Sequence, residues 1–202
     1  MKETTISEAQ QVKIATTENP VHQVIRERWS ARSFSNQPIT QQELDTIFEA
    51  ASWAPSSMNE QPWMYVYAAK GSPVFDAMWN TLMAGNQPWA QNAAVLIASL
   101  SRKNHMNTGA ANKYNWYDVG SANQNLLLQA ASMGILGHVM GGFRRSEAEQ
   151  LIQLPEDMEL VCFIALGHLA SADELEEPFR SRELTPRNRN PLSTFVFQDK
   201  LL

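Results

Sequence analysis

Residues 117–143 read YDVGSANQNLLLQAASMGILGHVMGGF, and the pattern of this stretch changes once along its length. Up to Gly134 the residues follow the pattern of a long helix, which the glycine ends. From Ile135 the segment reads as a strand that runs into a turn at Gly141 and Gly142. A long helix followed directly by a strand indicates a domain in which helices pack on a sheet.

The rest of the chain continues this alternation. Thr40 and Glu43 form the pattern of a capping box before a helix that Pro55 stops. Further helices are expected over 20–30, 72–84 and 144–155, core strands over 63–69, 92–100 and 159–169, and a strand-like tail segment over 193–197. Helices alternating with about four core strands and a tail strand predict a layered α+β domain.

The composition is that of an ordinary globular protein. The chain has 202 residues, of which 44% are hydrophobic and 18% charged, and this length suffices for one sizeable core. Residues 1–17 are polar and lack a clear period, so we expect a flexible leader before a single domain over 18–202, whose extended tail covers about 172–202.

Charge and hydropathy exclude several kinds of partner. The net charge of −5 argues against a nucleic-acid footprint, and no apolar run is long enough to cross a membrane. The one cysteine, Cys162, lies in an apolar run, where it is expected to be a buried hydrophobic residue. A chain with a single cysteine forms no internal disulfide, which suits the cytoplasm.

The common catalytic motifs are absent. The sequence has no P-loop, no G-x-G-x-x-G after a strand, no H-E-x-x-H and no G-x-S-x-G elbow. The four histidines are scattered without the spacing of metal ligands, so we expect no metal site. Nucleotide-hydrolase, Rossmann, zinc and serine-hydrolase chemistry therefore have no carrier here.

Two arginine-rich segments stand far apart in the chain. In RWSARSF, Arg28, Ser30 and Arg32 follow a spacing that turns their side chains the same way in an extended backbone. In TPRNRNP, Arg187 and Arg189 have the same spacing. Each pair taken alone is most simply solvated surface, but guanidinium forks from both segments could bind the oxygens of one phosphate.

Two further segments offer groups suited to a flat polar ligand. The loop PSSMNEQP, residues 55–62, supplies hydroxyl and amide groups, and the turn at Gly141 and Gly142 lets a planar molecule approach the backbone closely. Together with the arginines, these segments describe a pocket for a phosphorylated planar cofactor.

The segments RWSARSF, AASWAPSSMNEQPW, residues 117–143 and TPRNRNP resemble, in order and spacing, the FMN-dependent nitroreductase family. The resemblance runs from about residue 20 to 197. It implies a layered fold with a central, mostly antiparallel sheet flanked by helices. It also implies a homodimer in which the C-terminal strand, residues 193–197, is exchanged between the two copies.

The resemblance also implies which residues bind FMN. Arg28, Ser30 and Arg32 would face its phosphate and the adjoining flavin edge, and Arg187 and Arg189 would close on the phosphate. The loop that reaches the flavin across the dimer interface would consist of Pro55, Ser56, Ser57 and Asn59, with Gln61 nearby. Gly141 and Gly142 would present backbone N–H groups to the flavin nitrogen that accepts hydride, and Asn86 would contact the flavin.

The sequence departs from the family pattern at three positions. Arg32 and Arg187 stand where many members carry lysine, which keeps the charge but changes the geometry. Pro88 stands where a lysine is often found. Trp116 and Tyr117 are expected to roof the space for the substrate.

The activity that the resemblance implies is hydride transfer from NADH or NADPH, through FMN, to a nitroaromatic, a quinone or a similar electron-poor small molecule. The chemistry is that of the cofactor, so no protein side chain is expected to be a nucleophile or a general base. Two alternatives stay open on the sequence alone: an FMN-binding module, a store or sensor without NAD(P)H turnover, and a scaffold that binds no cofactor.

Overall fold

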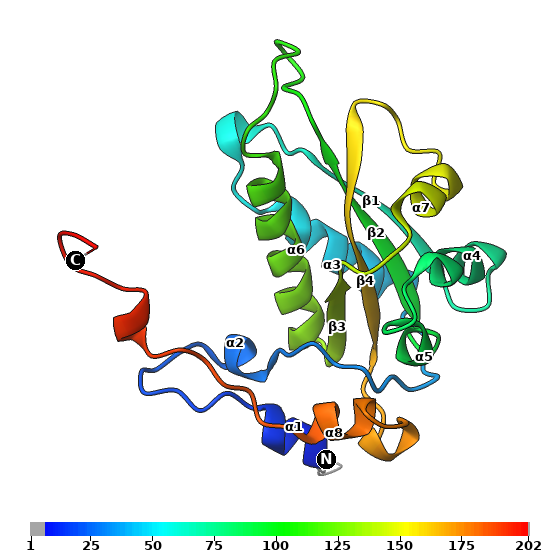
Figure 1. Ribbon diagram of the computed structural model, residues 1–202, viewed down its shortest axis with the longest axis vertical. Coiled ribbons are helices and arrows are strands. Elements are labelled where there is room, and N and C mark those ends of the chain that lie inside the picture. The colour runs from blue at the N-terminus through cyan, green and yellow to red at the C-terminus, as the bar shows by residue number, and fades with distance from the viewer. Residues whose placement is uncertain (1–6, 202) are drawn as a thin grey trace.

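The structure, a computed structural model, describes residues 7–201 (Figure 1). Its sheet contains β1 (Trp63–Ala69), β2 (Val95–Arg102), β3 (Ile135–Met140) and β4 (Met158–His168). The helices are α1 (Glu8–Lys13), α2 (Gln23–Glu27), α3 (Gln41–Ser52), α4 (Pro73–Thr81), α5 (Gln87–Ala90), α6 (Asn115–Ser132), α7 (Arg145–Leu151) and α8 (Phe179–Leu184). Short 3-10 turns cover Ser57–Asn59, Ala172–Glu174 and Leu192–Thr194.

The four strands form one antiparallel sheet in the order β1, β2, β4, β3. The two central strands, β2 and β4, are nearly continuous apolar runs because both of their faces are covered. This confirms the α+β fold class and the antiparallel sheet predicted from the sequence.

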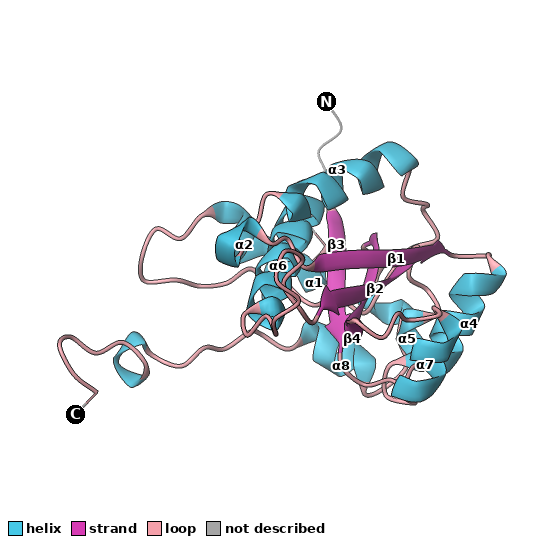
Figure 2. Ribbon diagram, turned by 90° about the horizontal axis from the view of Figure 1, so that it is seen from above, coloured by secondary structure: helices cyan, strands magenta, loops and turns pink. Residues whose placement is uncertain are grey.

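Helices cover both faces of the sheet (Figure 2). On one face, Leu44 and Ile47 of α3 and Leu126 of α6 pack against β2, β3 and β4. On the other face, Phe75 of α4, Trp89 of α5 and the segment around residues 29–34 pack on the opposite side chains of β2 and β4. The long helix α6 leads into β3 through Gly134, as the pattern of residues 117–143 predicted.

Two predicted helices have other bounds in the structure. The helix expected over 20–30 is the five-residue α2, which ends at Glu27, and Arg28 after it is extended. The helix expected over 72–84 ends at Thr81, because Leu82 leaves it to form a β-bridge with Phe143. The short helix α5, which follows, was not expected from the sequence.

The two ends of the chain also differ from expectation. In the segment predicted as a flexible leader, residues 8–13 form α1, which Ser7 caps and which packs against α8 (Figure 1). Residues 1–6 of that segment lie outside the described residues. Residues 193–197 are not a strand in the single chain; the tail forms a 3-10 turn and extends away from the body, where it has no strand to pair with (Figures 1 and 2).

Candidate functional site

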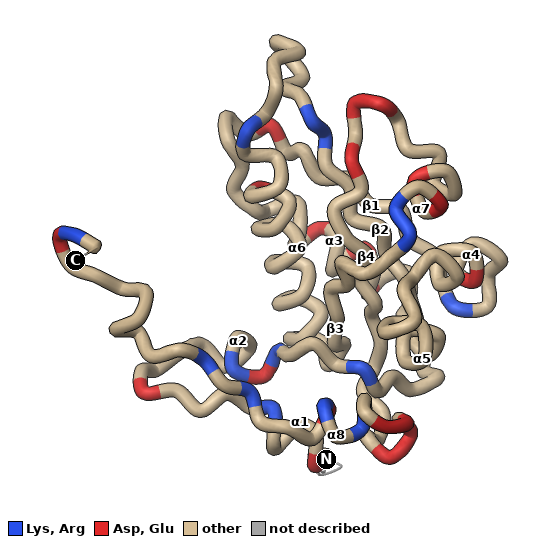
Figure 3. Tube along the Cα trace, in the orientation of Figure 1, with Lys and Arg blue, Asp and Glu red and all other residues tan. Residues whose placement is uncertain are grey.

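The two arginine-rich segments meet at the end of α2. The guanidinium of Arg187 donates from Nη1 to the carbonyl oxygen of Arg28 at 2.5 Å and from Nη2 to that of Arg26. Burial lowers the pKa of Arg28, with a further contribution from nearby Arg189, and lowers the pKa of Arg187, to which Arg28 and Arg189 add. Three cations from two distant segments therefore lie close enough for their charges to interact. Figure 3 shows Lys and Arg positions, in blue, on α2 and on the neighbouring part of the tail.

Two buried N–H donors in this arginine group have no hydrogen-bond partner among the described residues. They are the Nε atoms of Arg28 and Arg187. A buried charged donor without a partner is costly, and converging guanidinium groups with free N–H groups suit a phosphate or another small dianion. The group Arg28, Arg187 and Arg189 is called the anion site below.

Arg32, four residues after Arg28, belongs to a second cluster with Trp89 and His138. Its guanidinium carbon is 5.9 Å from the centre of the Trp89 ring, and the imidazole of His138 is 4.4 Å from that ring, centre to centre. His138 Nδ1 lies 3.0 Å from the carbonyl oxygen of Ala31, so the neutral ring donates its proton there. Burial, with the charge of Arg32, lowers the pKa of His138 to about 4, which keeps the ring neutral at pH 7.

A buried carboxylate, that of Glu183, holds the segment of residues 29–32 by hydrogen bonds. Glu183 is fully buried and accepts hydrogen bonds from Trp29 Nε1 at 3.0 Å and from the backbone N–H of Arg32 at 3.2 Å. Burial raises the pKa of Glu183, while these hydrogen bonds and the charges of Lys13 and Arg32 oppose the rise. Ser30 lies exposed between the two predicted arginines of this segment.

The Gly-Gly turn and Asn86, which the sequence analysis assigned to one site, lie next to each other. The carbonyl oxygen of Gly142 accepts from Asn86 Nδ2 and from the backbone N–H of Met83, both at 3.0 Å. A Cβ added to Gly142 would lie 3.1 Å from Asn86 Nδ2, whereas a Cβ added to Gly141 would meet nothing within 4 Å. Gly141 therefore borders open space, and Asn86 positions the turn.

The loop of residues 55–61 adopts an unusual backbone. Met58, Asn59 and Gln61 have positive φ angles of 52°, 57° and 49°, a region that non-glycine residues seldom adopt. The backbone N–H of Ser57 donates to Asp118 Oδ2 at 3.1 Å, and that of Gln61 donates to Ser56 Oγ at 3.1 Å. Strained backbone held by specific partners is concentrated at functional sites.

A second anchor joins this loop to the hairpin that follows β2. Glu60 accepts from the backbone N–H of Met106 at 3.0 Å, and its other carboxylate oxygen is 3.2 Å from His105 Nδ1. The loop lies at the N-terminal end of α6, whereas α2 and the anion site lie at the other end (Figure 1). Within one chain, then, the predicted loop residues do not meet the predicted arginines.

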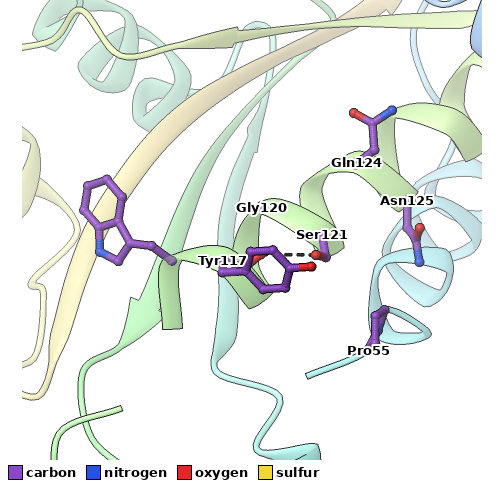
Figure 4. A pocket seen from close by; sticks show the side chains of 7 residues that line it. Pro55, Tyr117, Gly120, Ser121, Gln124 and Asn125 are labelled. Carbon is purple, nitrogen blue, oxygen red and sulfur yellow. Dashed lines mark hydrogen bonds between the residues drawn. The ribbon is translucent and has the colours of Figure 1, made fainter. Parts of the chain in front are cut away.

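The outer face of α6 is left open beside this loop (Figure 4). Pro55, Trp116, Tyr117 and the α6 residues Gly120, Ser121, Gln124 and Asn125 line a shallow groove of about 510 Å³. Trp53, which ends α3, is 79% exposed, and Met58 and Tyr117 are also strongly exposed. Large aromatic and aliphatic side chains gathered on one open face are typical of an interaction surface.

Sequence reasoning missed the residues that support the site rather than line it. Trp89, His138 and Glu183 carry no motif, and their partners are distant in the chain, so only the fold reveals them. Among the described residues no three His, Cys, Asp or Glu side chains are placed to hold a metal ion, and no helix there is long and apolar enough to cross a membrane.

Comparisons with known proteins identify the family and the fold. A model described as the nitroreductase family matches residues 25–74 and 68–168. The NADPH-flavin oxidoreductase of Vibrio harveyi is 28% identical over 180 residues, covering 84% of this chain and 70% of that protein. The FMN reductase (NAD(P)H) of Bacillus subtilis is 25% identical over 197 residues, covering 91% and 77%. A solved structure described as an oxidoreductase containing FMN has a TM-score of 0.89 at 33% identity, covering 94% of this chain and 97% of that one.

Proposed function

Because the chain belongs to the nitroreductase family, we propose that it is an FMN-dependent oxidoreductase that uses NADH or NADPH to reduce an electron-poor small molecule, such as a nitroaromatic or a quinone. The names of relatives from Vibrio harveyi and Bacillus subtilis support this activity. The observation that carries it is the anion site, where buried arginine donors without protein partners converge.

The residues present fit this cofactor. Arg28, Arg187 and Arg189 would supply the charge for its phosphate, and Arg32, which lies over the Trp89 ring, would supply a further cation for the flavin edge. The open space at Gly141 allows a flat ring to approach the backbone. When bound, FMN would supply the hydride transfer between the nicotinamide and the acceptor. The protein supplies orientation and electrostatics, and none of its side chains needs to form a covalent bond.

We also propose that the enzyme is a homodimer in which the loop of residues 55–61 serves the site of the partner copy. Three observations support the dimer: the loop is distant from the anion site of its own chain, the outer face of α6 is open, and Phe195, Val196 and Phe197 of the tail are exposed. Residues 193–197 would become a strand when they add to the other copy's sheet. With its single cysteine, Cys162, buried and free, the protein suits the cytoplasm.

The double substitution Arg187→Ala with Arg189→Ala tests the proposed function. It removes two charge-assisted contacts to the phosphate, so the dissociation constant for FMN should rise by about a hundredfold or more. Riboflavin, which lacks the phosphate, should bind the variant and the wild type equally. Both ligands are titrated against the apo-protein by flavin fluorescence.

Arg180→Ala is the matched control, because Arg180 lies on α8 in an exposed ion pair with Asp173. Its FMN affinity should equal that of the wild type. Unchanged FMN affinity in the double variant would show that the C-terminal arginines do not bind the phosphate and would remove the main support for the proposal.

A further inference from the structure

The N-terminal helix is fastened to the segment that carries the phosphate arginines. Lys13, the last residue of α1, is only 7% exposed, and its Nζ donates to the carbonyl oxygens of Arg182 at 2.7 Å and Thr185 at 2.6 Å. Thr185 is the residue that ends α8, and Arg187 follows it by two positions. Lys13 is therefore hydrogen-bonded to the end of α8, directly before Arg187 of the anion site.

The chemistry of a helix end explains why a buried cation is stable at this place. The last carbonyl groups of a helix have no donor within the helix and carry partial negative charge. The ammonium of Lys13 satisfies two of them on α8. Burial lowers the pKa of Lys13, and the charges of Arg32 and Arg187 lower it further. The carboxylate of Glu183 raises it. The cost of burying the cation is thus offset by specific partners rather than by solvent.

The same turn of α8 is also bound to the first arginine segment. Glu183 lies between Arg182 and Thr185 in the chain, and its carboxylate accepts from Trp29 Nε1 and from the Arg32 backbone N–H. One helical turn is therefore tied to α1 on one side and to residues 29–32 on the other.

The segment after α1 also contacts the first arginine segment. The backbone N–H of Ala15 donates to the carbonyl oxygen of Arg26 at 2.9 Å, and Arg26 Nε donates to the carbonyl oxygen of Ala15 at 3.1 Å. The same Arg26 carbonyl accepts from Arg187. Residues 13–15 thus contact both segments that the arginines come from.

We propose that Lys13 is a positioning residue of the anion site: by holding the end of α8 it sets where Arg187 and Arg189 stand relative to Arg28. Lys13 acts through α8, because its ammonium donates to two backbone carbonyl oxygens at the end of that helix. This proposal rests on the proposed function, in which the anion is the phosphate of FMN.

The first test is Lys13→Met, which keeps the length of the side chain and removes its donors. The apo-protein is titrated with FMN and with riboflavin. The variant should bind FMN about tenfold more weakly or worse, and riboflavin within twofold of the wild type. Lys103→Met is the matched control, because Lys103 Nζ also donates to a backbone carbonyl, that of Glu156, far from the anion site. Its affinities should not change.

The second test separates positioning from general loosening of the fold. Lys13→Met is introduced into the variant that already lacks Arg187 and Arg189. If Lys13 acts through these arginines, the added substitution should change FMN affinity by less than twofold. A full additional loss in that background would overturn the proposal, and so would equal FMN affinity of Lys13→Met and the wild type.

If Lys13→Met fails to fold, Lys13→Gln, which retains an N–H donor, is titrated in its place. It should weaken FMN binding and leave riboflavin binding unchanged, and unchanged FMN affinity would again overturn the proposal. A wild-type protein that binds no FMN would instead contradict the proposed function, so the two failures are distinguishable.

Discussion

The guanidinium of Arg187 has donors of two kinds, paired and unpaired. Its terminal nitrogens bridge the carbonyl oxygens of Arg28 and Arg26, while its buried Nε has no partner among the described residues. The planar fork makes this division possible, because its five N–H donors point in fixed and different directions. A lysine ammonium could also donate to two carbonyl groups, as Lys13 does, but its donors rotate freely and lack the fixed directions of the planar fork.

His138 gives a pH dependence at the residue scale. Its pKa is about 4 in the folded protein and near 6.5 in the unfolded chain, so the unfolded state binds the proton first as the pH falls. Its contribution to stability is therefore fully present above pH 6.5 and is lost between pH 6.5 and about 4. The free energy of unfolding of the apo-protein should fall over this range by roughly 3 kcal/mol more in the wild type than in His138→Gln. Urea unfolding at several pH values measures it, and parallel curves for the two proteins would contradict the assignment.

At this scale the sequence revealed the charges but not their surroundings. The spacing in RWSARSF and TPRNRNP indicated that the arginines share a ligand, and the structure brings Arg28, Arg187 and Arg189 together. The sequence could not indicate Glu183 or Lys13, because each contacts backbone groups about 150 residues or more away in the chain. Such partners follow from the fold and have no local pattern.

Among the elements, those with strong local signals were predicted best. The capping box of Thr40 and Glu43 and the apolar face that follows gave α3, and both capping hydrogen bonds are present. The leader helix α1 has only six residues, too short to be stable alone, and its stability comes from packing on α8. Its one local signal, the capping box of Ser7 and Gln10, lies in a segment that composition alone marked as flexible.

Two glycines of one strand and its turn should respond to substitution in opposite ways. A Cβ on Gly137, within β3, would lie 2.3 Å from Leu127 Cδ2 and 2.8 Å from Leu166 Cδ2, in the packed core. Gly137→Ala should therefore lower the free energy of unfolding by about 1–3 kcal/mol. Gly141→Val meets open space in the protein, so it should leave stability unchanged while weakening flavin binding. Urea unfolding and flavin titration of both variants measure the two effects. Normal flavin affinity in folded Gly141→Val would remove the Gly-Gly turn from the binding site.

On the scale of the whole molecule, one chain holds only part of the proposed site. The anion site lies near the C-terminal end of α6, and the Gly-Gly turn directly follows β3. The strained loop of residues 55–61 lies at the N-terminal end of α6 (Figure 1). A sequence cannot distinguish a loop that serves its own site from one that serves a partner's, because both have the same motif. The structure makes the question specific by leaving an open apolar face beside that loop.

Removing residues 191–202 tests the dimer. This truncation keeps Arg187 and Arg189 but removes the exposed Phe195, Val196 and Phe197, which would pack on the partner copy. The wild type should have twice the mass of one chain at micromolar concentration, and the truncated protein should dissociate at concentrations at which the wild type does not. Light scattering after size exclusion measures both masses. A monomeric wild type would contradict the homodimer.

The central claim is that this chain binds FMN and reduces it with a nicotinamide. The most direct measurement is the visible absorption spectrum of the purified protein, supplied with FMN if needed, before and after anaerobic addition of NADH and of NADPH. The account predicts a flavin band that bleaches with at least one of the two donors and returns when an electron-poor acceptor such as a quinone is added. A flavin band that neither donor bleaches would indicate a binding module without turnover, and a protein that takes up no FMN at all would contradict the account.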